Sequence, residues 1–173
     1  YLNLLGTYFD AYSMAYLHAA DILFKDYMQV IINNQTNTPK NQSIPEEYIC
    51  MFGPIFHSYH QSIELKLKSL LLKAGCQFHE GHKLSELVKR LNDYYCTEEV
   101  KKQFDFINAF DKYTDNAQLG RYPINNKGNI IGKNDGKIVF VGNKEGKGGI
   151  ATMVYHIHEL YKSLFPNLKR KIE

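Results

Sequence analysis

The sequence predicts an all-α protein, an antiparallel helical bundle with one small β-hairpin inserted before its last helix. Apolar residues recur at steps of three and four in five segments, which is the spacing of an amphipathic helix. β-Prone residues dominate only one segment, 129–141, where they flank the turn sequence Asn134-Asp135-Gly136. Because isolated hairpins are marginally stable, we expect this hairpin to pack on the bundle or on a partner. A chain of 173 residues is the size of one domain, and we predict a single helical domain over residues 1–173.

A long first helix is predicted before residue 33, because apolar residues follow a helical period through that segment. Residues 33–43 are polar and aperiodic, which indicates a loop. The predicted buried stripe of the first helix is Leu5, Phe9, Tyr12, Tyr16, Ala19, Leu23, Tyr27 and Val30.

The second predicted helix begins near Pro45, and the sequence FGP at 52–54 is expected to break or kink it, because Pro54 lacks an amide donor. This helix is predicted to end at Gly75, since glycine favours the left-handed conformation of a helix C-terminus. A third helix is predicted from about Lys83. The expected inward residues are Phe56, His60, Ile63, Leu67, Leu70 and Ala74 in the second helix, and Leu84, Leu87, Val88 and Leu91 in the third.

Thr97 is the predicted N-cap of a fourth helix, with two glutamates in its first turn, where the helix dipole favours anions. The last helix is predicted to follow Gly149 and to end at Pro166, which leaves a basic tail at 168–171. The expected buried residues are Val100, Phe104, Ile107 and Phe110 in the fourth helix, and Ile150, Val154, Ile157, Leu160 or Tyr161, and Leu164 in the last.

The composition is that of an ordinary globular protein, with 44% hydrophobic and 23% charged residues. A net charge of +3 is too small to indicate a nucleic-acid-binding protein by itself. The apolar runs are too short for a membrane span, so no membrane association is expected. Cys50, Cys76 and Cys96 lack CxxC spacing, which suits small buried thiols in a reducing compartment. We therefore expect a cytoplasmic protein.

Several histidines raise the question of a metal site. The sequence HEGH at 79–82 lies downstream of His57 and His60. A zincin site needs two histidines at i and i+4 of one helix with a glutamate between them, and Gly81 interrupts that pattern. No cysteine or carboxylate cluster completes a ligand set. We therefore predict no metal or other cofactor.

A glycine-rich stretch at 139–152 superficially resembles a phosphate-binding loop. Gly142 and Gly146 stand one residue too close for a P-loop, and Gly148 occupies the place of the required Ser or Thr. An NTPase is therefore not expected. Backbone donors at the start of the following helix, together with Lys144 and Lys147, could still hold a phosphate. The alternative is a simple glycine-rich connector.

A polar row accompanies the apolar stripe of the second predicted helix. Glu64 and Lys68 stand at i and i+4, and His60 lies one turn before Glu64. One interpretation is an intrahelical ion pair, which contributes a few tenths of a kcal/mol. The other is that Glu64 lies at the edge of the core and orients a cation, most naturally Arg121.

Three stretches resemble the HEPN superfamily of small helical-bundle domains. They are IELKLKSLLLKAG at 63–75, GHKLSELVKRL at 81–91 and DNAQLGRYP at 115–123, so that the resemblance covers about residues 55–123. The residues that match the family's pattern are Glu64, Leu67 and Lys68 in the first stretch, Gly81, His82, Leu84 and Leu87 in the second, and Asp115, Arg121, Tyr122 and Pro123 in the third.

The resemblance implies an α-helical bundle that is commonly a homodimer, with RNA or nucleotide contacts in a cleft at the dimer interface. Many members of the superfamily are metal-independent endoribonucleases of toxin–antitoxin, phage-defence or RNA-processing systems. Their signature is an arginine followed four to six residues later by a histidine. The arginine steadies the charge of the phosphorane, and the histidine acts on the ribose hydroxyl or the leaving group.

This sequence departs from that signature, because no histidine follows Arg121 within the required window. The next one is His156, beyond the predicted hairpin, and it restores the pair only if the bundle returns it towards Arg121. His156 and His158 flank Ile157 on opposite sides, so at most one of them faces such a cleft.

Three functions therefore remain open. The first is an RNA- or nucleotide-binding domain that uses Arg121, Tyr122, Lys144 and Lys147. The second is an endoribonuclease that uses Arg121 and His156. The third is an interaction module that oligomerises through its aromatic first helix.

Arg121 itself has two roles that suit its forked guanidinium. It contacts phosphate, or it clamps the structure by pairing with Asp115 or Glu64. In either case Glu64, Lys68, His82 and Asp115 are expected to be structural polar residues that organise the bundle.

Overall fold

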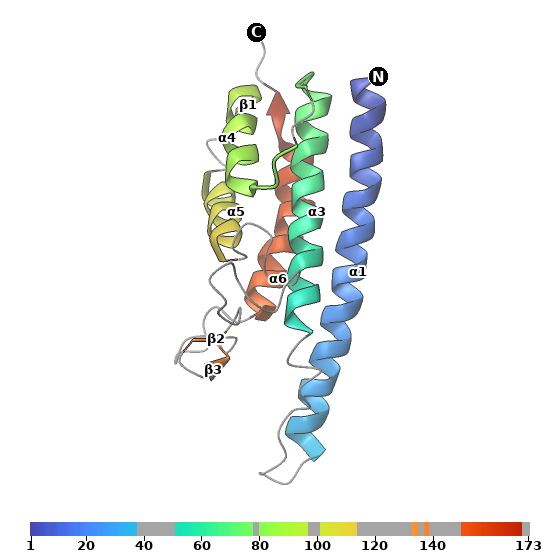
Figure 1. The fold of residues 1–173 in the computed structure, drawn as a ribbon, viewed down its shortest axis with the longest axis vertical. Helices are drawn as coiled ribbons and strands as arrows, with labels where there is room; N and C mark the ends of the chain where they lie inside the picture. Colours follow the sequence, from blue (N-terminus) through green and yellow to red (C-terminus); the bar gives the residue numbers. More distant parts are fainter. Residues whose placement is uncertain are drawn as a thin grey trace.

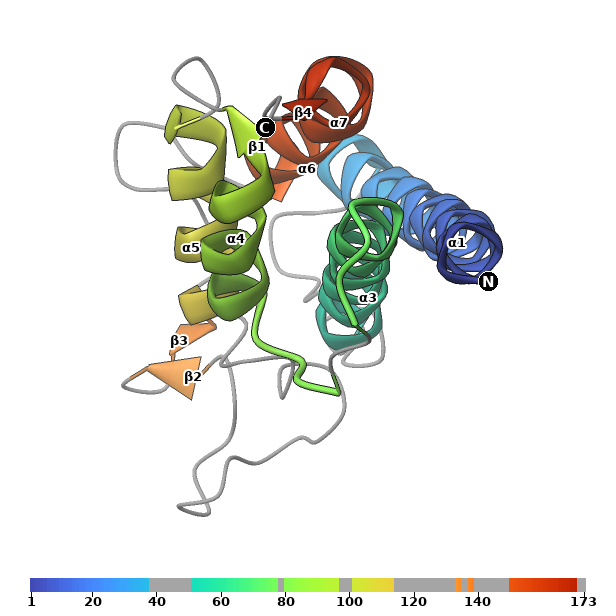
Figure 2. The same ribbon diagram turned by 90° about the horizontal axis from the view of Figure 1, so that it is seen from above.

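The computed structural model describes residues 1–37, 51–77, 80–96, 101–113, 133–134, 137–138 and 150–170. Its helices are α1 (Leu2–Asn37), α3 (Phe52–Lys73), α4 (Leu84–Tyr94), α5 (Lys101–Tyr113), α6 (Ile150–Glu159), the π-helical turn η1 (Leu160–Leu164) and α7 (Phe165–Asn167). They lie side by side as a bundle, with α1 at one edge and α4 and α5 at the opposite side (Figures 1 and 2). The prediction of an all-α helical bundle is confirmed.

Helix α3 contributes the largest share of the described core. It runs antiparallel to α1 and faces α4 on another side (Figure 1). Its six predicted inward residues are all buried: Phe56, His60, Ile63, Leu67, Leu70 and Ala74. The predicted stop at Gly75 is also confirmed, with a φ of 91°. The amides of Cys76 and Gly75 donate to the carbonyls of Leu71 and Leu72, each at 3.0 Å, which is the pattern of a Schellman cap.

The beginning of α3 contains the FGP sequence at which a break or kink was predicted. The helix begins at Phe52, so Pro54 lies in its first turn. The amides of a first turn have no intrahelical acceptor, and proline is tolerated there. The FGP sequence therefore lies in the first turn of α3, and the predicted break of a longer helix at this point stays a prediction. The predicted start near Pro45 lies outside the described residues.

The face that α1 packs on α3 overlaps the predicted stripe only in part: Tyr27 is buried and Leu23 packs against the core, as predicted. Tyr12 and Tyr16, which were expected to face inward, are 62% and 37% exposed. At Gly6, an added Cβ would lie 3.0 Å from Cγ of Lys73 and 3.2 Å from the carbonyl oxygen of Ser69. The two backbones therefore approach each other closely at Gly6, where a large side chain would not fit. The residues that α1 buries are Gly6, Ser13, Leu17, Ala20 and Tyr27.

The remaining helices bury the predicted stripes wherever their side chains are described. These residues are Leu84, Leu87, Val88 and Leu91 in α4, Phe104, Ile107 and Phe110 in α5, and Val154, Ile157, Leu160 and Leu164 in α6 and η1. The predicted N-cap Thr97 and the predicted core residue Val100 lie outside the described part of the chain.

The end of the last helix also needs a correction. The helical path continues through Pro166 to Asn167, because Pro166 lies in the first turn of α7, where no amide is required. Two residues of the predicted basic tail then form β4 (Lys169–Arg170). This strand pairs antiparallel with β1 (Tyr95–Cys96), in the register Tyr95↔Arg170 and Cys96↔Lys169.

Within the predicted hairpin at 129–141, the structure describes only β2 (Lys133–Asn134) and β3 (Lys137–Ile138). They pair antiparallel in the register Lys133↔Ile138 and Asn134↔Lys137. Two residues per strand do not amount to the predicted hairpin of thirteen residues (129–141), which stays a prediction. None of the described helices is both long and apolar enough to cross a membrane.

Candidate functional site: buried carboxylates at the entrance of α4

Glu64 is the centre of a polar cluster between α3 and the beginning of α4. Its side chain is 1% exposed, and its Oε1 accepts hydrogen bonds from Nζ of Lys68 at 2.8 Å and from Nδ1 of His82 at 2.9 Å. The predicted pair of Glu64 and Lys68 is therefore present. It is not the weak exposed pair of an isolated helix, because the Lys68 side chain is only 6% exposed.

The second carboxylate oxygen of Glu64 is buried and has no hydrogen-bond partner among the described residues. A buried carboxylate oxygen without a donor costs free energy, and such atoms are rare in folded proteins. The cluster therefore has capacity for one more donor. The predicted role of Glu64 in orienting a cation requires a carboxylate oxygen of this kind.

Asp111 forms a second buried cluster at the same helix entrance. Its Oδ2 accepts hydrogen bonds from the amide of Ser85 at 3.0 Å and from its Oγ at 2.7 Å. Its Oδ1 lies 3.4 Å from Nε2 of His60. Asp111 and His60 are 2% and 0% exposed. One carboxylate thus joins α5, α4 and α3.

Asp111 also caps α4 from another helix. The N-cap position of α4 is occupied by Lys83, whose side chain makes no capping hydrogen bond. The first amides of a helix need external acceptors, and the helix dipole favours an anion there. Asp111 supplies both the hydrogen-bond acceptor and the negative charge. Burial raises the pKa of Asp111, but the hydrogen bonds from His60 and Ser85 outweigh that effect and lower the pKa to about 2.

The sequence analysis missed Asp111 and Ser85. A signal for Asp111 was present, because it follows Ile107 by four residues and thus continues the apolar stripe of α5 with a charge. A second signal was the lysine at position 83, where a helix ordinarily begins with Ser, Thr, Asp or Asn.

Five of the nine predicted site residues lie outside the described part of the chain: the structural residue Asp115 and the predicted phosphate contacts Arg121, Tyr122, Lys144 and Lys147. Their distances to Glu64 and to His156 therefore stay untested. The structure does describe Glu64, Lys68, His82 and His156, and it brings the first three together.

His156 is exposed on α6 and its ring lies 5.3 Å, centroid to centroid, from that of Phe106 on α5. His158 faces another neighbour, since its Nε2 lies 2.9 Å from Oδ1 of Asp21 on α1. The two histidines thus flank the buried Ile157 on opposite sides, as predicted. His156 is the one on the side of α5, the helix that leads into the segment with Arg121.

A third polar cluster fastens η1 to the pair of long helices. The Oγ of Ser13 donates to the carbonyl of Ser62 at 2.9 Å, and the Oγ of Ser62 donates to the carbonyl of Ser13 at 2.8 Å. The hydroxyl of Tyr161 lies 2.8 Å from the first Oγ and 2.5 Å from the second. Burial raises the pKa of Tyr161 well above its ordinary value. This phenol is therefore a neutral structural group.

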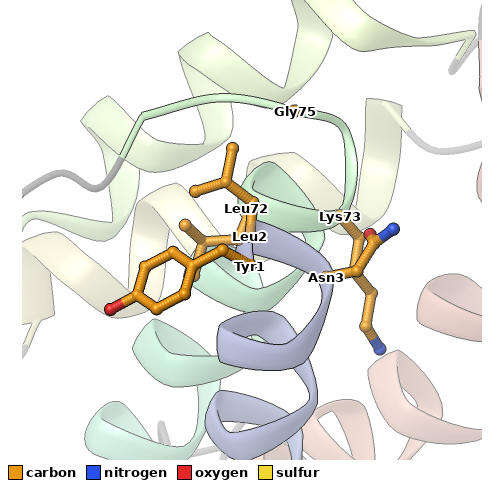
Figure 3. A pocket seen from close by; sticks show the side chains of 6 residues that line it. All are labelled: Tyr1, Leu2, Asn3, Leu72, Lys73 and Gly75. Carbon is orange, nitrogen blue, oxygen red and sulfur yellow. The ribbon is translucent and has the colours of Figure 1, made fainter.

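One hollow on the described surface lies apart from these clusters. It has a volume of about 440 Å³ at the ends of α1 and α3 and is lined by Tyr1, Leu2, Asn3, Leu72, Lys73 and Gly75 (Figure 3). It contains none of the predicted site residues. Among the described residues, no group of three His, Cys, Asp or Glu side chains is arranged to hold a metal ion.

The family comparison agrees with the bundle and with the order of the motifs. The HEPN domain model matches residues 55–137, a segment that contains most of α3, all of α4 and α5, and the sequence Arg121–Pro123. Over this segment, the chain is similar to the HEPN domain family. No curated protein and no solved structure matches the chain significantly.

Proposed function

We propose that this protein is a HEPN domain that binds RNA or a nucleotide and acts as a homodimer, in a bacterial defence or RNA-processing setting. The observation that carries this proposal is the family match, because it extends through Arg121, Tyr122 and Pro123. Similarity to the HEPN domain family supports RNA-directed function in general, and the arginine is the residue type that binds phosphate with two parallel hydrogen bonds.

The buried cluster of Glu64 supports a specific arrangement of that site. Lys68 and His82 already occupy one oxygen of the carboxylate, and the other oxygen lacks a donor among the described residues. We propose that the guanidinium of Arg121 donates to this oxygen with one edge and presents its other edge to a phosphate. This arrangement reconciles the two roles that the sequence left open for Arg121.

Binding of a labelled single-stranded RNA, followed by fluorescence anisotropy, tests the proposal. Loss of one charge-assisted hydrogen bond is worth about 1.5–3 kcal/mol, so Arg121→Ala should weaken binding roughly 10- to 100-fold. Arg90→Ala is the matched control, because Arg90 lies on α4 within the matched segment. Affinity should also fall steeply between low and moderate salt.

Two results would contradict the proposal. One is an absence of binding to RNA and to mononucleotides by the unaltered chain. The other is equal affinity of the unaltered chain and Arg121→Ala, with circular dichroism showing that both are folded. The predicted phosphate contacts of Tyr122, Lys144 and Lys147 are tested by the same assay with single alanine variants, for which smaller losses are expected.

A second candidate is a metal-independent endoribonuclease that uses Arg121 and His156. It is favoured by the exposure of His156 and by its position against Phe106 on α5. RNA cleavage in EDTA that is abolished by Arg121→Ala and by His156→Ala would support it. His158→Ala is the control, because His158 is exposed on the same helix but faces Asp21. Bound but intact RNA would leave the first candidate in place.

We also propose that residues 1–173, including the predicted hairpin at 129–141, form a single domain of a cytoplasmic protein. Cys76 is a free, buried thiol, which agrees with the predicted reducing compartment. The third function left open by the sequence, oligomerisation through the first helix, depends on the outer side of α1.

A further inference from the structure

Helix α1 has a second apolar face opposite the face that it packs on α3. We call the exposed residues Tyr8, Ala11, Tyr12, Ala15, Tyr16 and Ala19 the outer face of α1. At 100° per residue they fall within one arc of roughly 140°. Helix α1 stands at the edge of the bundle in both views, and no other described element is drawn against this side (Figures 1 and 2).

The outer face carries no charged side chain. Between residues 1 and 24 the only Asp, Glu, Lys or Arg residues are Asp10 and Asp21. Both point to the other side of the helix, since Asp10 pairs with Lys66 and Lys73 on α3, and Asp21 accepts from Tyr59 on α3. When a face packs on its own copy, any charge on it meets a charge of the same sign. The outer face of α1 has no charged side chain, so this repulsion does not arise.

We propose that a second copy of this chain packs on the outer face of α1, with the two α1 helices antiparallel about a two-fold axis between residues 13 and 14. This proposal deepens the homodimer of the proposed function by placing its interface. In such a pair, residue i faces residue 27 − i of the partner.

Shape supports this register. It sets each exposed tyrosine against an exposed alanine: Tyr8 against Ala19, Tyr12 against Ala15, and Tyr16 against Ala11. A large side chain that enters the space above a small one is the packing by which two helices interlock. A shift of the register by one residue loses all three matches.

The area of the face is also sufficient. Tyr8, Tyr12 and Tyr16 are 59%, 62% and 37% exposed, and Tyr1 and Leu4 extend the face with 96% and 60% exposure. At about 200 Å² for a whole aromatic side chain, these residues and Ile22 offer roughly 700 Å². This is close to the ~800 Å² per partner of a standard specific interface.

The placement has a consequence for the site. Helices α4 and α5 lie on the opposite side of the bundle from α1 (Figure 2). A dimer through α1 therefore keeps the two copies of the Glu64 and Asp111 clusters apart, and each copy must bind its RNA or nucleotide separately. This differs from the shared cleft at a dimer interface that the resemblance led us to expect.

Light scattering after size exclusion measures the mass of the 173-residue chain and of two variants. The unaltered chain should have twice the chain mass of 20.1 kDa, and Tyr12→Lys should have the mass of one chain with unchanged circular dichroism. Tyr155→Lys is the matched control, because Tyr155 is 60% exposed on α6 and should leave the dimer intact. A monomeric unaltered chain at about 0.1 mM, or a dimer that survives Tyr12→Lys, would overturn the proposal.

Disulfide trapping tests the register. A mixture of Tyr8→Cys and Ala19→Cys should form a crosslinked dimer, identified by mass spectrometry of the linked peptides. Tyr8→Cys alone should not, because its two copies lie about 16 Å apart along the axis, beyond the reach of a disulfide. A crosslink of Tyr8→Cys with itself would indicate parallel helices and would overturn the antiparallel arrangement.

Two further readouts separate this proposal from its alternatives. A monomer that floats with vesicles of phosphatidylcholine and phosphatidylglycerol would assign the outer face to a lipid surface and overturn the proposal. RNA binding by the monomeric Tyr12→Lys variant would uphold the proposed RNA function independently of the dimer. If Arg121→Ala loses RNA binding but keeps the mass of a dimer, the proposed α1 interface is upheld independently of the RNA function.

Discussion

Replacement of Asp111 by asparagine should lower the free energy of unfolding at pH 7 by about 2 kcal/mol. The pKa of Asp111 falls from an ordinary 3.8 to about 2, and each pKa unit corresponds to about 1.4 kcal/mol. A carboxylate with a lowered folded-state pKa contributes stability that is present above its unfolded-state pKa and is lost as the pH falls towards its folded-state pKa. Asparagine has the shape of the protonated acid and lacks this contribution at every pH.

Urea unfolding of both proteins at several pH values measures the effect. The difference in unfolding free energy should stay near 2 kcal/mol from pH 7 to pH 5, fall to about half at pH 3, and nearly vanish at pH 2. Asp105→Asn is the control, because Asp105 is exposed on the same helix. A difference that does not change between pH 7 and pH 3 would refute the electrostatic account of the α4 cap.

Two further substitutions test the packing of α1 on its neighbours. Tyr161→Phe removes the hydroxyl between Ser13 and Ser62 and should lower the free energy of unfolding by about 1–2 kcal/mol in urea, whereas Tyr155→Phe, at an exposed position, should change it by less than about 0.5 kcal/mol. Gly6→Leu should cost about 1–3 kcal/mol in the same assay, because even a Cβ at this position lies 3.2 Å from the backbone oxygen of Ser69, and an unchanged midpoint would show that the helices can separate without cost.

The helices within residues 55–137 were predictable because each has a single apolar stripe, and that stripe is the side that packs on the neighbouring helices. The stripe of α4 is an example, since its four predicted residues are all buried. Helix α1 was different, because it has apolar residues on both sides and periodicity alone does not select the buried one. The informative signal was side-chain size: Gly6, Ser13 and Ala20 follow at intervals of seven and mark the contact with α3.

The polar clusters could be predicted only in part, because local spacing predicts contacts within a helix but not between helices. The pair of Glu64 and Lys68 follows from i, i+4 spacing. The cap on α4 does not, since Asp111 is 26 residues away from Ser85 in the sequence and reaches it through the packing of α5. Tertiary structure decides which acceptor serves the amides of a helix that begins without a capping side chain.

The two buried carboxylates hold one helix entrance within the segment that matches the HEPN domain model. Glu64 binds His82 just before α4, and Asp111 binds Ser85 in its first turn, so both hold the same four-residue entrance from two different helices. The contacts of the first two HEPN-like stretches thus have a structural role in which the bundle satisfies their charges internally. If the protein binds RNA or a nucleotide as proposed, phosphate recognition requires a cation outside these two clusters, and the proposed one is Arg121. The remaining oxygen of Glu64 is the point at which the scaffold and that proposed contact would meet.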